Sequence, residues 1–542
     1  MVTEKQQIRN IWMLSREYGT LAGAGGVKDV VSQLAEAFGR RAECSVQVVL
    51  PCYGFLHPEE EGFVPLTDPN DPGRLLKYEV DMDHPAERRR ESVTFFHKKR
   101  GGVSLYLVDA KRFRAKKGVY TYTAEEEVKA AWQKKSMGHH DYFAMNILLQ
   151  KAALELMILL GTVPDIIHCH DGHTALLPAI IREYCGYRSY FRSTGCLVTI
   201  HNAGIGYHQE VGDLFYARSI TGLPAAVVDE HLLGGDFDPF LVAGSYALVN
   251  TVSENYAREL QETDDDELTG WLGHELASRG VVLEGVTNGI DPALFNPASG
   301  ESREEFAFDP GNEEDDLAGK KRCRDVLLQR LTRGDLESGI ERSGYLKTGM
   351  EGPLFTFVGR LSEQKGVDIF IEALRLIMEK ERTCQVLILG NGDSVIEENL
   401  QGLVHSAVGP GRVCFLRGYS SELARSVYSA GDFLVIPSRF EPCGLTDFIA
   451  QLYGNIPIVH HVGGLVKVRD GYSGIAYKGN SPMVLTAALE RGLELYSDKK
   501  AMRMMQVQAV RVIKENYTWS IVMKKYAELY KKSRESAGSL FK

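Results

Sequence analysis

The loop at residues 359–366 has the residue types that could bind a doubly charged anion. It reads GRLSEQKG and follows an apolar run, so Arg360 and Lys365 place two positive charges in one loop. A pyrophosphate suits such a pair, because charge-assisted hydrogen bonds are worth roughly 1.5–3 kcal/mol each. The alternative interpretation is that both side chains are solvated surface cations.

A carboxylate stands in a second loop that also follows an apolar run. Residues 437–445 read PSRFEPCGL, and Pro442 favours an extended backbone at Glu441, which would hold its side chain off the strand end. A Glu is costly to bury without a partner, so an exposed Glu441 paired with Arg439 is the alternative. The later segment 462–465, VGGL, offers successive backbone N–H groups to a phosphate or sugar oxygen, or is a plain glycine turn.

Two further candidate loops lie in the first half of the chain. Residues 23–26, GAGG, precede a helical pattern, and backbone N–H groups at such a place attract anions. The loop is not the GxGxxG dinucleotide fingerprint, because Lys28 stands where the third glycine would be, and a plain tight turn is the alternative. His201 and Asn202 could hydrogen-bond a sugar hydroxyl, unless His201 is a core histidine with a backbone partner.

The segment 168–173, HCHDGH, has the residue types of a metal site. Neighbouring residues of a strand point to opposite faces, however, so its three histidines cannot easily converge on one ion. We therefore expect histidines that support the structure or position a substrate.

Short apolar runs recur along the chain, and helical patterns separate most of them. The runs are Ile11–Leu14, Val46–Leu50, Val103–Val108, Asp165–His168, Leu197–Ile200, Ala247–Val252, Val281–Val286, Leu354–Val358, Val386–Leu389, Val413–Leu416, Phe433–Ile436 and Ile456–Val459. Strands that are apolar throughout and alternate with helices predict parallel sheets covered on both faces. Because these strands are too many for one comfortable sheet, we expect two doubly wound α/β domains, with ligands at the carboxyl ends of the strands.

Composition excludes several classes of protein. The 542 residues are 44% hydrophobic and 25% charged, which is typical of a globular chain. A net charge of −10 without a long basic run argues against a nucleic-acid partner. The longest apolar stretch, near residues 154–160, is too short to span a bilayer, and the N-terminus has no apolar export segment, so we expect no membrane partner. Nine scattered cysteines without a CxxC pair predict reduced thiols and a cytoplasmic location.

These segments resemble, over nearly the whole chain, the bacterial glycogen synthase and plant starch synthase family. The most specific are PSRFEPCGL with the later VGGL, GRLSEQKGVD at 359–368, TNGIDPALFNP at 287–297, HCHDGHTALLP at 168–178 and TIHNAG at 199–204. The resemblance implies an α/β fold of two Rossmann-like doubly wound domains facing a cleft, the GT-B architecture. We expect an acceptor-side domain at 1–286, a donor-side domain at 287–517 and a C-terminal helix, 518–542, crossing back to the first domain. The charged segment at about 301–349 is expected to be an insertion in the second domain or an elaborated start of it.

The resemblance also implies roles for individual residues. Arg360 and Lys365 would grip the donor diphosphate, Glu441 would lie near the transferring glucose, and His201 would contact that glucose. The other implied binding positions are Gly25, Gly26 and Asp29 of the first loop, Tyr120, Asn288, the base-stacking Tyr419, and the backbone of Cys443, Gly444, Leu445, Gly463, Gly464 and Leu465. No metal or other cofactor is expected, because side-chain cations and backbone N–H groups would meet the leaving charge.

The implied reaction is transfer of glucose, with retention, from ADP-glucose or UDP-glucose to the non-reducing 4-OH of an α-1,4-glucan, such as glycogen or a maltooligosaccharide. Four positions depart from the family pattern: Gly23 replaces a lysine, Gly172 replaces a tryptophan, and Asp447 and Lys467 differ from the common choices. Two alternatives therefore stay open. One is a glucosyltransferase with another acceptor, such as a phosphorylated sugar; the other is a catalytically silent regulator that binds glucan or nucleotide.

Overall fold

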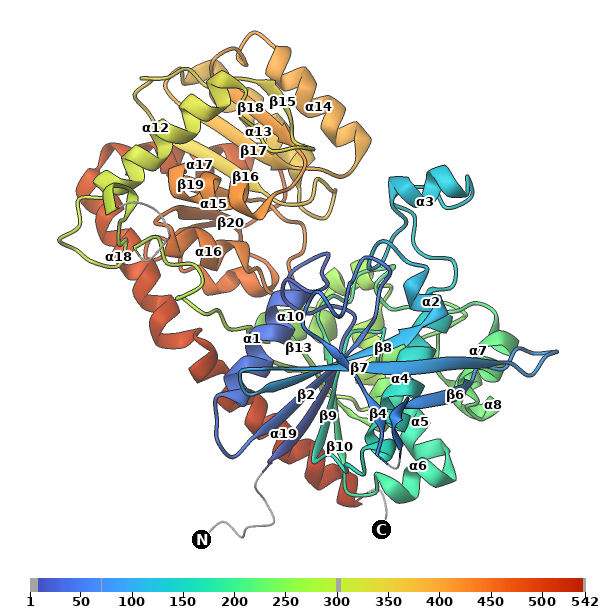
Figure 1. Cartoon of the computed structure of the whole chain (residues 1–542). Coiled ribbons are helices and arrows are strands. Elements are labelled where there is room, and N and C mark those ends of the chain that lie inside the picture. The colour runs from blue at the N-terminus through green and yellow to red at the C-terminus, as the bar shows by residue number, and fades with distance from the viewer. Residues whose placement is uncertain (1–7, 70, 299–303, 540–542) are drawn as a thin grey trace. The chain divides into compact units, whose positions relative to one another are not determined.

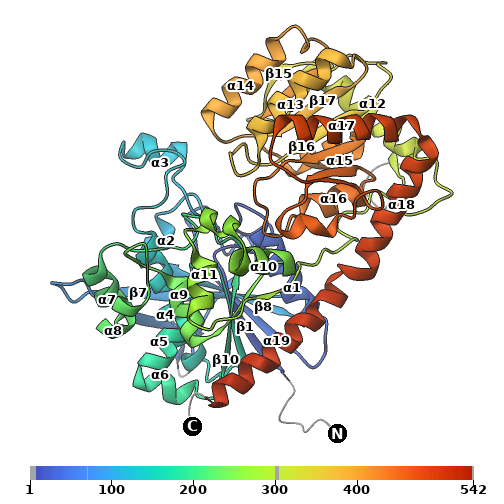
Figure 2. The ribbon, with the colours of Figure 1, turned by 180° about the vertical axis from the view of Figure 1, so that it is seen from behind.

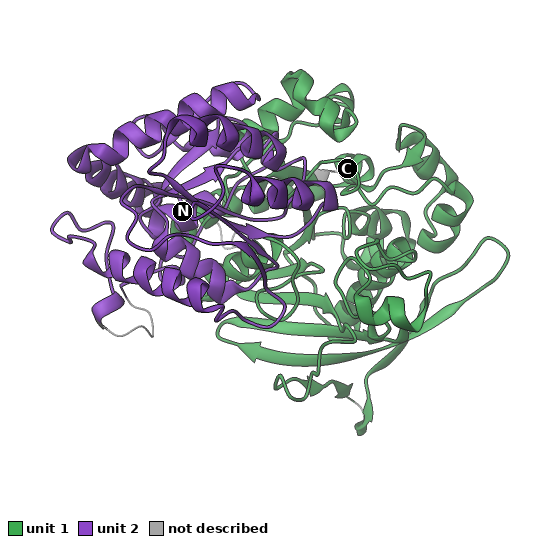
Figure 3. Cartoon of the chain, turned by 90° about the horizontal axis from the view of Figure 1, so that it is seen from above, with its two compact units in different colours: residues 1–289, 519–542 green, residues 290–518 purple. Residues whose placement is uncertain are grey.

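The computed structural model describes residues 8–69, 71–298 and 304–539, which form two compact units. Unit 1 comprises the residues up to 289 together with those from 519 onward, and unit 2 comprises residues 290–518 (Figure 3). The chain therefore passes from unit 1 into unit 2 and then returns. Thr287 and Asn288, which the sequence assigns to the second domain, are grouped by the structure with unit 1.

Unit 1 is built on a sheet whose central strands are parallel and buried. Their order is β14 (Glu284–Gly285), β13 (Leu248–Thr251), β10 (Gly195–Ile200), β9 (Ile166–His170), β1 (Asn10–Leu14), β2 (Ser45–Pro51) and β8 (Val103–Ala110). Helices α1 (Val27–Gly39) and α19 (Trp519–Ser539) cover one face, and α4 (Tyr142–Leu159) and α9 (Pro239–Tyr246) cover the other (Figures 1 and 2). Coverage on both faces explains why these strands are apolar throughout. The predicted run 281–286 is a strand only at β14.

An antiparallel extension of this sheet was not predicted. Strand β7 (Arg90–Arg100) pairs antiparallel with β8, with β6 (Lys77–Asp81) and with β3 (Val64–Pro65), while β4 (Thr67–Asp68) pairs with β5 (Asp71–Leu75). These strands are largely exposed, so their sequences are polar and show no continuous apolar run.

Unit 2 contains a seven-stranded sheet in the order β15 (Glu341–Gly344), β18 (Val413–Arg417), β17 (Gln385–Gly390), β16 (Leu354–Val358), β19 (Phe433–Ile436), β20 (Ile456–His460) and β21 (Ile475–Tyr477). All strands except β15 are parallel. One core packs α13 (Val367–Lys380), α14 (Ser394–His405) and α17 (Pro482–Ser497) on the sheet. The other packs α12 (Ala318–Arg333), α15 (Ser421–Ala430) and α16 (Thr446–Leu452).

The expected insertion at about 301–349 is, in its described part, integral to unit 2. Helix α12 contributes Leu327, Leu328 and Leu331 to a core, and β15 forms the antiparallel edge of the sheet. From residue 304 onward the segment therefore fits the alternative of an elaborated start of the second domain rather than an insertion. Residues 301–303 lie outside the described part of the chain.

Helices α4 and α19 pack against opposite faces of the unit 1 sheet. Helix α4 is long and apolar enough to cross a membrane by length and composition, and 83% of it is buried inside the protein. It is longer than the apolar stretch that the sequence indicates. Helix α19 lies along β10 (Figure 2). It also contacts α1, where Trp519 Nε1 donates to Gln33 Oε1 at 2.8 Å, and β9, where the Tyr530 hydroxyl lies 3.0 Å from His168 Nδ1.

Candidate active site

The two charged loops of unit 2 begin where the strand order of the sheet reverses. Strands β16, β17 and β18 follow one another in one direction and β19, β20 and β21 in the other, so the reversal lies between β16 and β19. In open α/β sheets, ligands bind at such reversals, beyond the carboxyl ends of the strands. The loops 359–366 and 437–445 leave those two ends, and the Arg439 N–H joins them by donating to Gln364 O at 2.8 Å.

Lys365 and Glu441 form a close ion pair across these loops. Lys365 Nζ lies 2.6 Å from Glu441 Oε2, and Ser438 Oγ donates to the same oxygen at 2.9 Å. The Glu441 side chain is only 10% exposed, so its carboxylate needs this compensation. The alternative of Glu441 paired with Arg439 is wrong, because Arg439 pairs with Asp368 at 2.6 Å.

Arg360 and Tyr419 are exposed and free to meet a ligand. Arg360 makes no hydrogen bond or ion pair with any residue in the described ranges. The charges of Arg360, Lys365 and Glu441 together give the two loops one net positive charge. Tyr419 follows β18 and is 59% exposed, which is compatible with stacking on a flat group.

The glycine segments hold two loop backbones in contact. The Gly464 N–H donates to Glu441 O at 2.9 Å, and a Cβ on Gly463 would overlap that same oxygen. The Leu465 N–H donates to Val462 O. The N–H groups of Gly464 and Leu465 are thus used inside the protein, contrary to the prediction of free donors there.

Unit 1 has its own reversal of strand order, between β1 and β9. Glu17, which sequence reasoning did not single out, lies just beyond β1 and is buried. Its Oε2 accepts the N–H groups of Ala24 and Gly25 at 2.7 and 3.0 Å, and its Oε1 accepts the Tyr120 hydroxyl at 2.7 Å. The N–H groups of Ala24 and Gly25 thus bind an anion, but this anion is a side chain of the protein and not a ligand.

Arg16 places a buried positive charge beside the same tyrosine. Its guanidinium lies 5.1 Å from the centre of the Tyr120 ring and donates to Asn146 Oδ1 at 3.3 Å. Tyr120 also stacks on His173, at 4.9 Å between ring centres. Burial and the nearby Glu17 raise the pKa of Tyr120, so this tyrosine stays protonated and can donate. An acidic residue directly after the first strand is the signal that could have revealed Glu17.

His201 lies at the carboxyl end of β10 among buried polar groups. Its Nε2 is 2.9 Å from His170 Nδ1, and its backbone N–H donates to Asp171 Oδ1 at 2.7 Å. Burial lowers the pKa of His201 to about 3, so the ring is neutral at pH 7. Burial also raises the pKa of Asp171 to about 7. The ring partner of His201 is a side chain, so the interpretation of a core histidine bound to the backbone is wrong.

The other histidines of this segment support the structure. His168 lies between the Tyr530 hydroxyl and Thr199 Oγ1, which is 2.7 Å from its Nε2. Within the described residues, no group of three or more His, Cys, Asp and Glu could hold a metal ion.

Three further candidate residues belong to unit 1. Asp29 lies in the first turn of α1, where burial raises its pKa, and Gly26 is the N-cap residue of that helix. Asn288 is buried, and its Oδ1 accepts no hydrogen bond from any described residue. An unpaired buried amide oxygen at a candidate position is consistent with a ligand contact.

Two protein-family models match successive parts of the chain. Residues 10–274 match the family described as "Starch synthase catalytic domain", and residues 352–494 match "Glycosyl transferases group 1". The glycogen synthase of Geotalea daltonii is 30% identical over 96% of this chain and 98% of that protein. The chain belongs to the glycogen synthase family. The glycogen synthase of Thermodesulfovibrio yellowstonii is 31% identical, over 71% of this chain and 72% of that protein.

A solved structure shows the same GT-B fold. The catalytic domain of starch synthase IV from Arabidopsis thaliana, bound to ADP and acarbose, superposes with a TM-score of 0.78 at 25% identity. The match covers 98% of this chain and 100% of that one. The predicted family and fold class are thereby confirmed, and the chain is a glucosyltransferase of the glycogen and starch synthase family.

Two of the departures from the family pattern, Gly23 and Gly172, have structural explanations in this glycogen synthase family member. A Cβ on Gly23 would overlap the side chain of Lys28, so the lysine of residue 28 occupies the space of a side chain at residue 23. The Lys28 ammonium makes no hydrogen bond or ion pair with a described residue. A Cβ on Gly172 would overlap His208 O, so the chain at 208 fills the space of a larger residue there.

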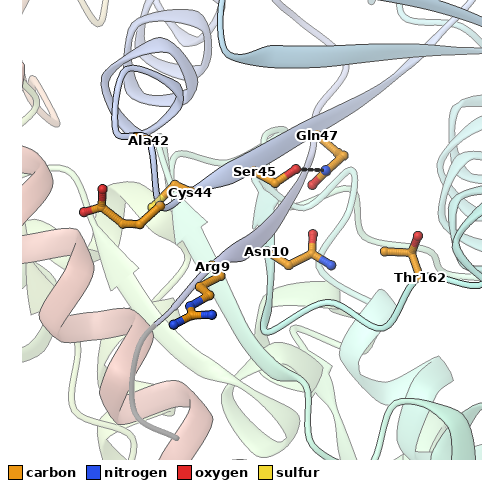
Figure 4. A pocket seen from close by; sticks show the side chains of 8 residues that line it. Arg9, Asn10, Ala42, Cys44, Ser45, Gln47 and Thr162 are labelled. Atoms are coloured by element: carbon orange, nitrogen blue, oxygen red, sulfur yellow. Dashed lines mark hydrogen bonds between the residues drawn. The ribbon is translucent and has the colours of Figure 1, made fainter. Parts of the chain in front are cut away.

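This glycogen synthase family member also has a polar pocket at the amino ends of the unit 1 strands, whereas the candidate site lies at their carboxyl ends. Arg9, Asn10 and Cys44 line it near the amino ends of β1 and β2, together with Ser45 and Gln47, whose side chains are hydrogen-bonded at 2.6 Å (Figure 4). It lies away from the carboxyl ends at which ligands of such sheets bind.

Proposed function

We propose that this chain transfers glucose, with retention, from ADP-glucose or UDP-glucose to the 4-OH of an α-1,4-glucan. The observation that carries the proposal is the contact of Lys365 with Glu441, where the strand order of unit 2 reverses. Arg360 lies in the same loop as Lys365 and has no partner among the described residues. Similarity to glycogen synthases and to a starch synthase bound to ADP and acarbose supports both substrate classes.

Arg360 and Lys365 stabilise the departing nucleoside diphosphate. Negative charge grows on the leaving phosphate oxygen as its bond to C1 of glucose breaks, and fixed cations at that place lower the barrier. Lys365 uses one of its three donors on Glu441, so it can still bind the phosphate. Two such cations supply this charge without a metal ion.

Glu441 acts as an electrostatic and positioning group. Its Oε2 accepts hydrogen bonds from Lys365 and Ser438, which stabilise the carboxylate and reduce its nucleophilicity. It therefore balances the positive charge that develops on glucose. The acceptor 4-oxygen forms the new bond to C1 on the face that the diphosphate leaves, and its proton passes to a leaving phosphate oxygen.

An azide experiment distinguishes the two roles of Glu441. If Glu441 were the nucleophile, azide added to Glu441→Ala would restore release of nucleoside diphosphate and yield β-glucosyl azide. We expect neither the restored turnover nor that product, and detection of both would refute the positioning role.

His201 contacts the glucose as a neutral hydrogen-bonding group. Its Nε2 is engaged by His170, so Nδ1 is the ring nitrogen left for a sugar hydroxyl. Since its pKa is about 3, it does not change charge between pH 5 and pH 9.

The first experiment is to incubate the protein with glycogen and either ADP-glucose or UDP-glucose. Glycogen-dependent release of the nucleoside diphosphate, with growth of the glycogen, would establish the reaction and show which donor is preferred. A folded protein that binds ADP or UDP but is silent with both donors would refute it.

A different acceptor is the second candidate. The filled space at Gly172 favours it, because a family tryptophan is replaced there by backbone of residue 208. Supplying phosphorylated sugars in competition with glycogen separates the two. The silent-regulator alternative is disfavoured, since Lys28 restores a lysine side chain beside the first loop.

A further inference from the structure

A buried ammonium group lies between the two glycine-containing loops of unit 2. Lys467 Nζ donates to Gly444 O at 2.8 Å, to Gly464 O at 3.1 Å and to Cys443 O. Its counter-ion is Asp447, whose Oδ1 lies 3.1 Å away. The side chains of Lys467 and Asp447 are 4% and 0% exposed, so the pair is closed off from solvent.

These contacts set the direction of two peptide groups. In a planar trans peptide, the carbonyl and the following N–H point to opposite sides. Because the carbonyls of Cys443 and Gly444 point at Lys467, the N–H groups of Gly444 and Leu445 point away from it. Neither N–H donates to another group in the described part of the chain.

The same ammonium fixes these peptides relative to Glu441. It holds residues 443 and 444 of one loop and residue 464 of the other, and the Gly464 N–H donates to Glu441 O at 2.9 Å. The carboxylate of Glu441 and the outward N–H groups of Gly444 and Leu445 are therefore held in fixed positions relative to one another.

Stability alone does not account for a buried ion pair. Taking two charges out of water costs about as much as their attraction returns, and well-packed apolar replacements are often neutral or stabilising. The pair Asp447–Lys467 therefore calls for a role beyond packing, and its place against the donor loops supplies one.

We propose that Lys467 is a positioning residue, which aims the N–H groups of Gly444 and Leu445 at the phosphate and glucose oxygens of the donor. This role rests on the proposed function. Lys467 does not touch the donor; it acts through the carbonyls that it holds. The donor oxygens would accept two N–H groups that are fixed before binding, so no reorganisation is needed when charge develops.

Another lysine of unit 2 provides a matched control. Lys320 of α12 is equally buried, and its Nζ donates to Tyr428 O, Ser429 O and Tyr453 O at 3.2, 3.2 and 2.7 Å. No carboxylate of the described residues contacts Lys320, and burial lowers its pKa to about 7. The contact of Lys467 with Asp447 instead raises the pKa of Lys467, although burial acts in the opposite direction. Lys320 thus shares the structural role of Lys467 without holding the loops at Glu441.

The test compares Lys467→Met, Lys467→Met with Asp447→Asn, and Lys320→Met. The double variant removes both charges, so it stays testable if the single variant fails to fold. We measure the Kd for ADP and UDP by calorimetry, the donor KM and kcat, the affinity for glycogen, and amide exchange at residues 443–446.

We expect the Lys467 variants to weaken ADP or UDP binding and raise the donor KM at least tenfold, with little change in glycogen affinity. Amide exchange at 443–446 should accelerate. Lys320→Met should lower the melting temperature and change nucleotide affinity by less than twofold.

Parent-like nucleotide affinity in the double variant, with a parent that binds ADP or UDP, would overturn the role of Lys467 alone. Equal losses of nucleotide affinity in the Lys320 and Lys467 variants would also overturn it. A folded parent that binds neither nucleotide would overturn the proposed function and this role with it.

Discussion

Lys365 and Glu441 depend on each other at the scale of single residues. Removing either leaves the other without its partner at the strand reversal of unit 2 and removes charge from the leaving-group site. We expect Lys365→Ala and Glu441→Ala each to reduce turnover at least ~100-fold, about 2.7 kcal/mol of barrier. Initial rates of nucleoside diphosphate release measure this loss.

Lys380→Ala is the control, because Lys380 is exposed and pairs with Glu490 on the surface of unit 2. It should retain parental turnover. Unchanged turnover in a soluble Lys365 or Glu441 variant would remove that residue from the mechanism.

Lys28 replaces in space the lysine that the family resemblance places at residue 23. We expect Lys28→Ala to reduce kcat/KM for the donor at least tenfold, because the ammonium is lost from the first loop. Gly23→Lys combined with Lys28→Ala should recover most of it, whereas Gly23→Lys alone should be impaired, because the two side chains would overlap. If kcat/KM of the double variant does not exceed that of Lys28→Ala, a lysine at residue 23 cannot replace Lys28 and the prediction is wrong.

Asp171 makes unit 1 sensitive to pH. Burial raises its pKa from 3.8 to about 7, so the folded chain holds a proton that the unfolded chain releases between these values. The free energy of unfolding therefore falls as the pH rises through this window. Above pH 7 the loss is on the order of a few kcal/mol. Asp171→Asn should raise the melting temperature at pH 8, and the gain should shrink toward pH 4. A gain independent of pH would rule out this titration.

At the scale of elements, the strands that are buried on both faces are the ones that the sequence predicts. The runs Leu354–Val358 and Phe433–Ile436 predict β16 and β19 residue for residue, because helices cover both sides of these strands. The exposed hairpin β6–β7 has no such signal. Candidate groups that follow strand ends, such as Arg360, Lys365 and Glu441, were predictable from position.

Glu17 and Lys467 were not predictable in the same way. Glu17 binds the backbone amides of residues 24 and 25, and Lys467 binds the carbonyls of residues 443, 444 and 464. Backbone partners carry no sequence signature. Only the folded chain therefore identifies Lys467, and the one sequence signal for Glu17 is its place shortly after β1.

The contact between the loops after β19 and β20 depends on the absence of a side chain at Gly463. Its φ is +51°, and a Cβ would overlap Glu441 O. We expect Gly463→Ala to displace Glu441 and reduce turnover at least tenfold. Gly471→Ala is the control, because its φ is +69° but a Cβ there meets open space. Equal effects of the two variants on kcat would show that backbone strain, rather than the loop contact, is responsible.

At the scale of the whole molecule, α19 ties the end of the chain to a strand far earlier in the sequence. The Tyr530 hydroxyl lies 3.0 Å from His168 Nδ1 on β9, and both groups are buried. We expect Tyr530→Phe to destabilise unit 1 by about 1 kcal/mol. Amide exchange should accelerate in β9 and β10 and stay unchanged in β16 and β19. Equal acceleration in both units would contradict their separate cores.

The return of the chain from unit 2 to unit 1 has a consequence for biosynthesis. Unit 1 needs α19 to cover β9 and β10, yet the ribosome makes residues 290–518 first. At about 5–20 residues per second, the nascent first unit waits on the order of 10–50 s with an apolar sheet face uncovered. Unit 2, although it comes second in the sequence, is complete first, and the nascent unit 1 is the segment that chaperones must shield until translation ends.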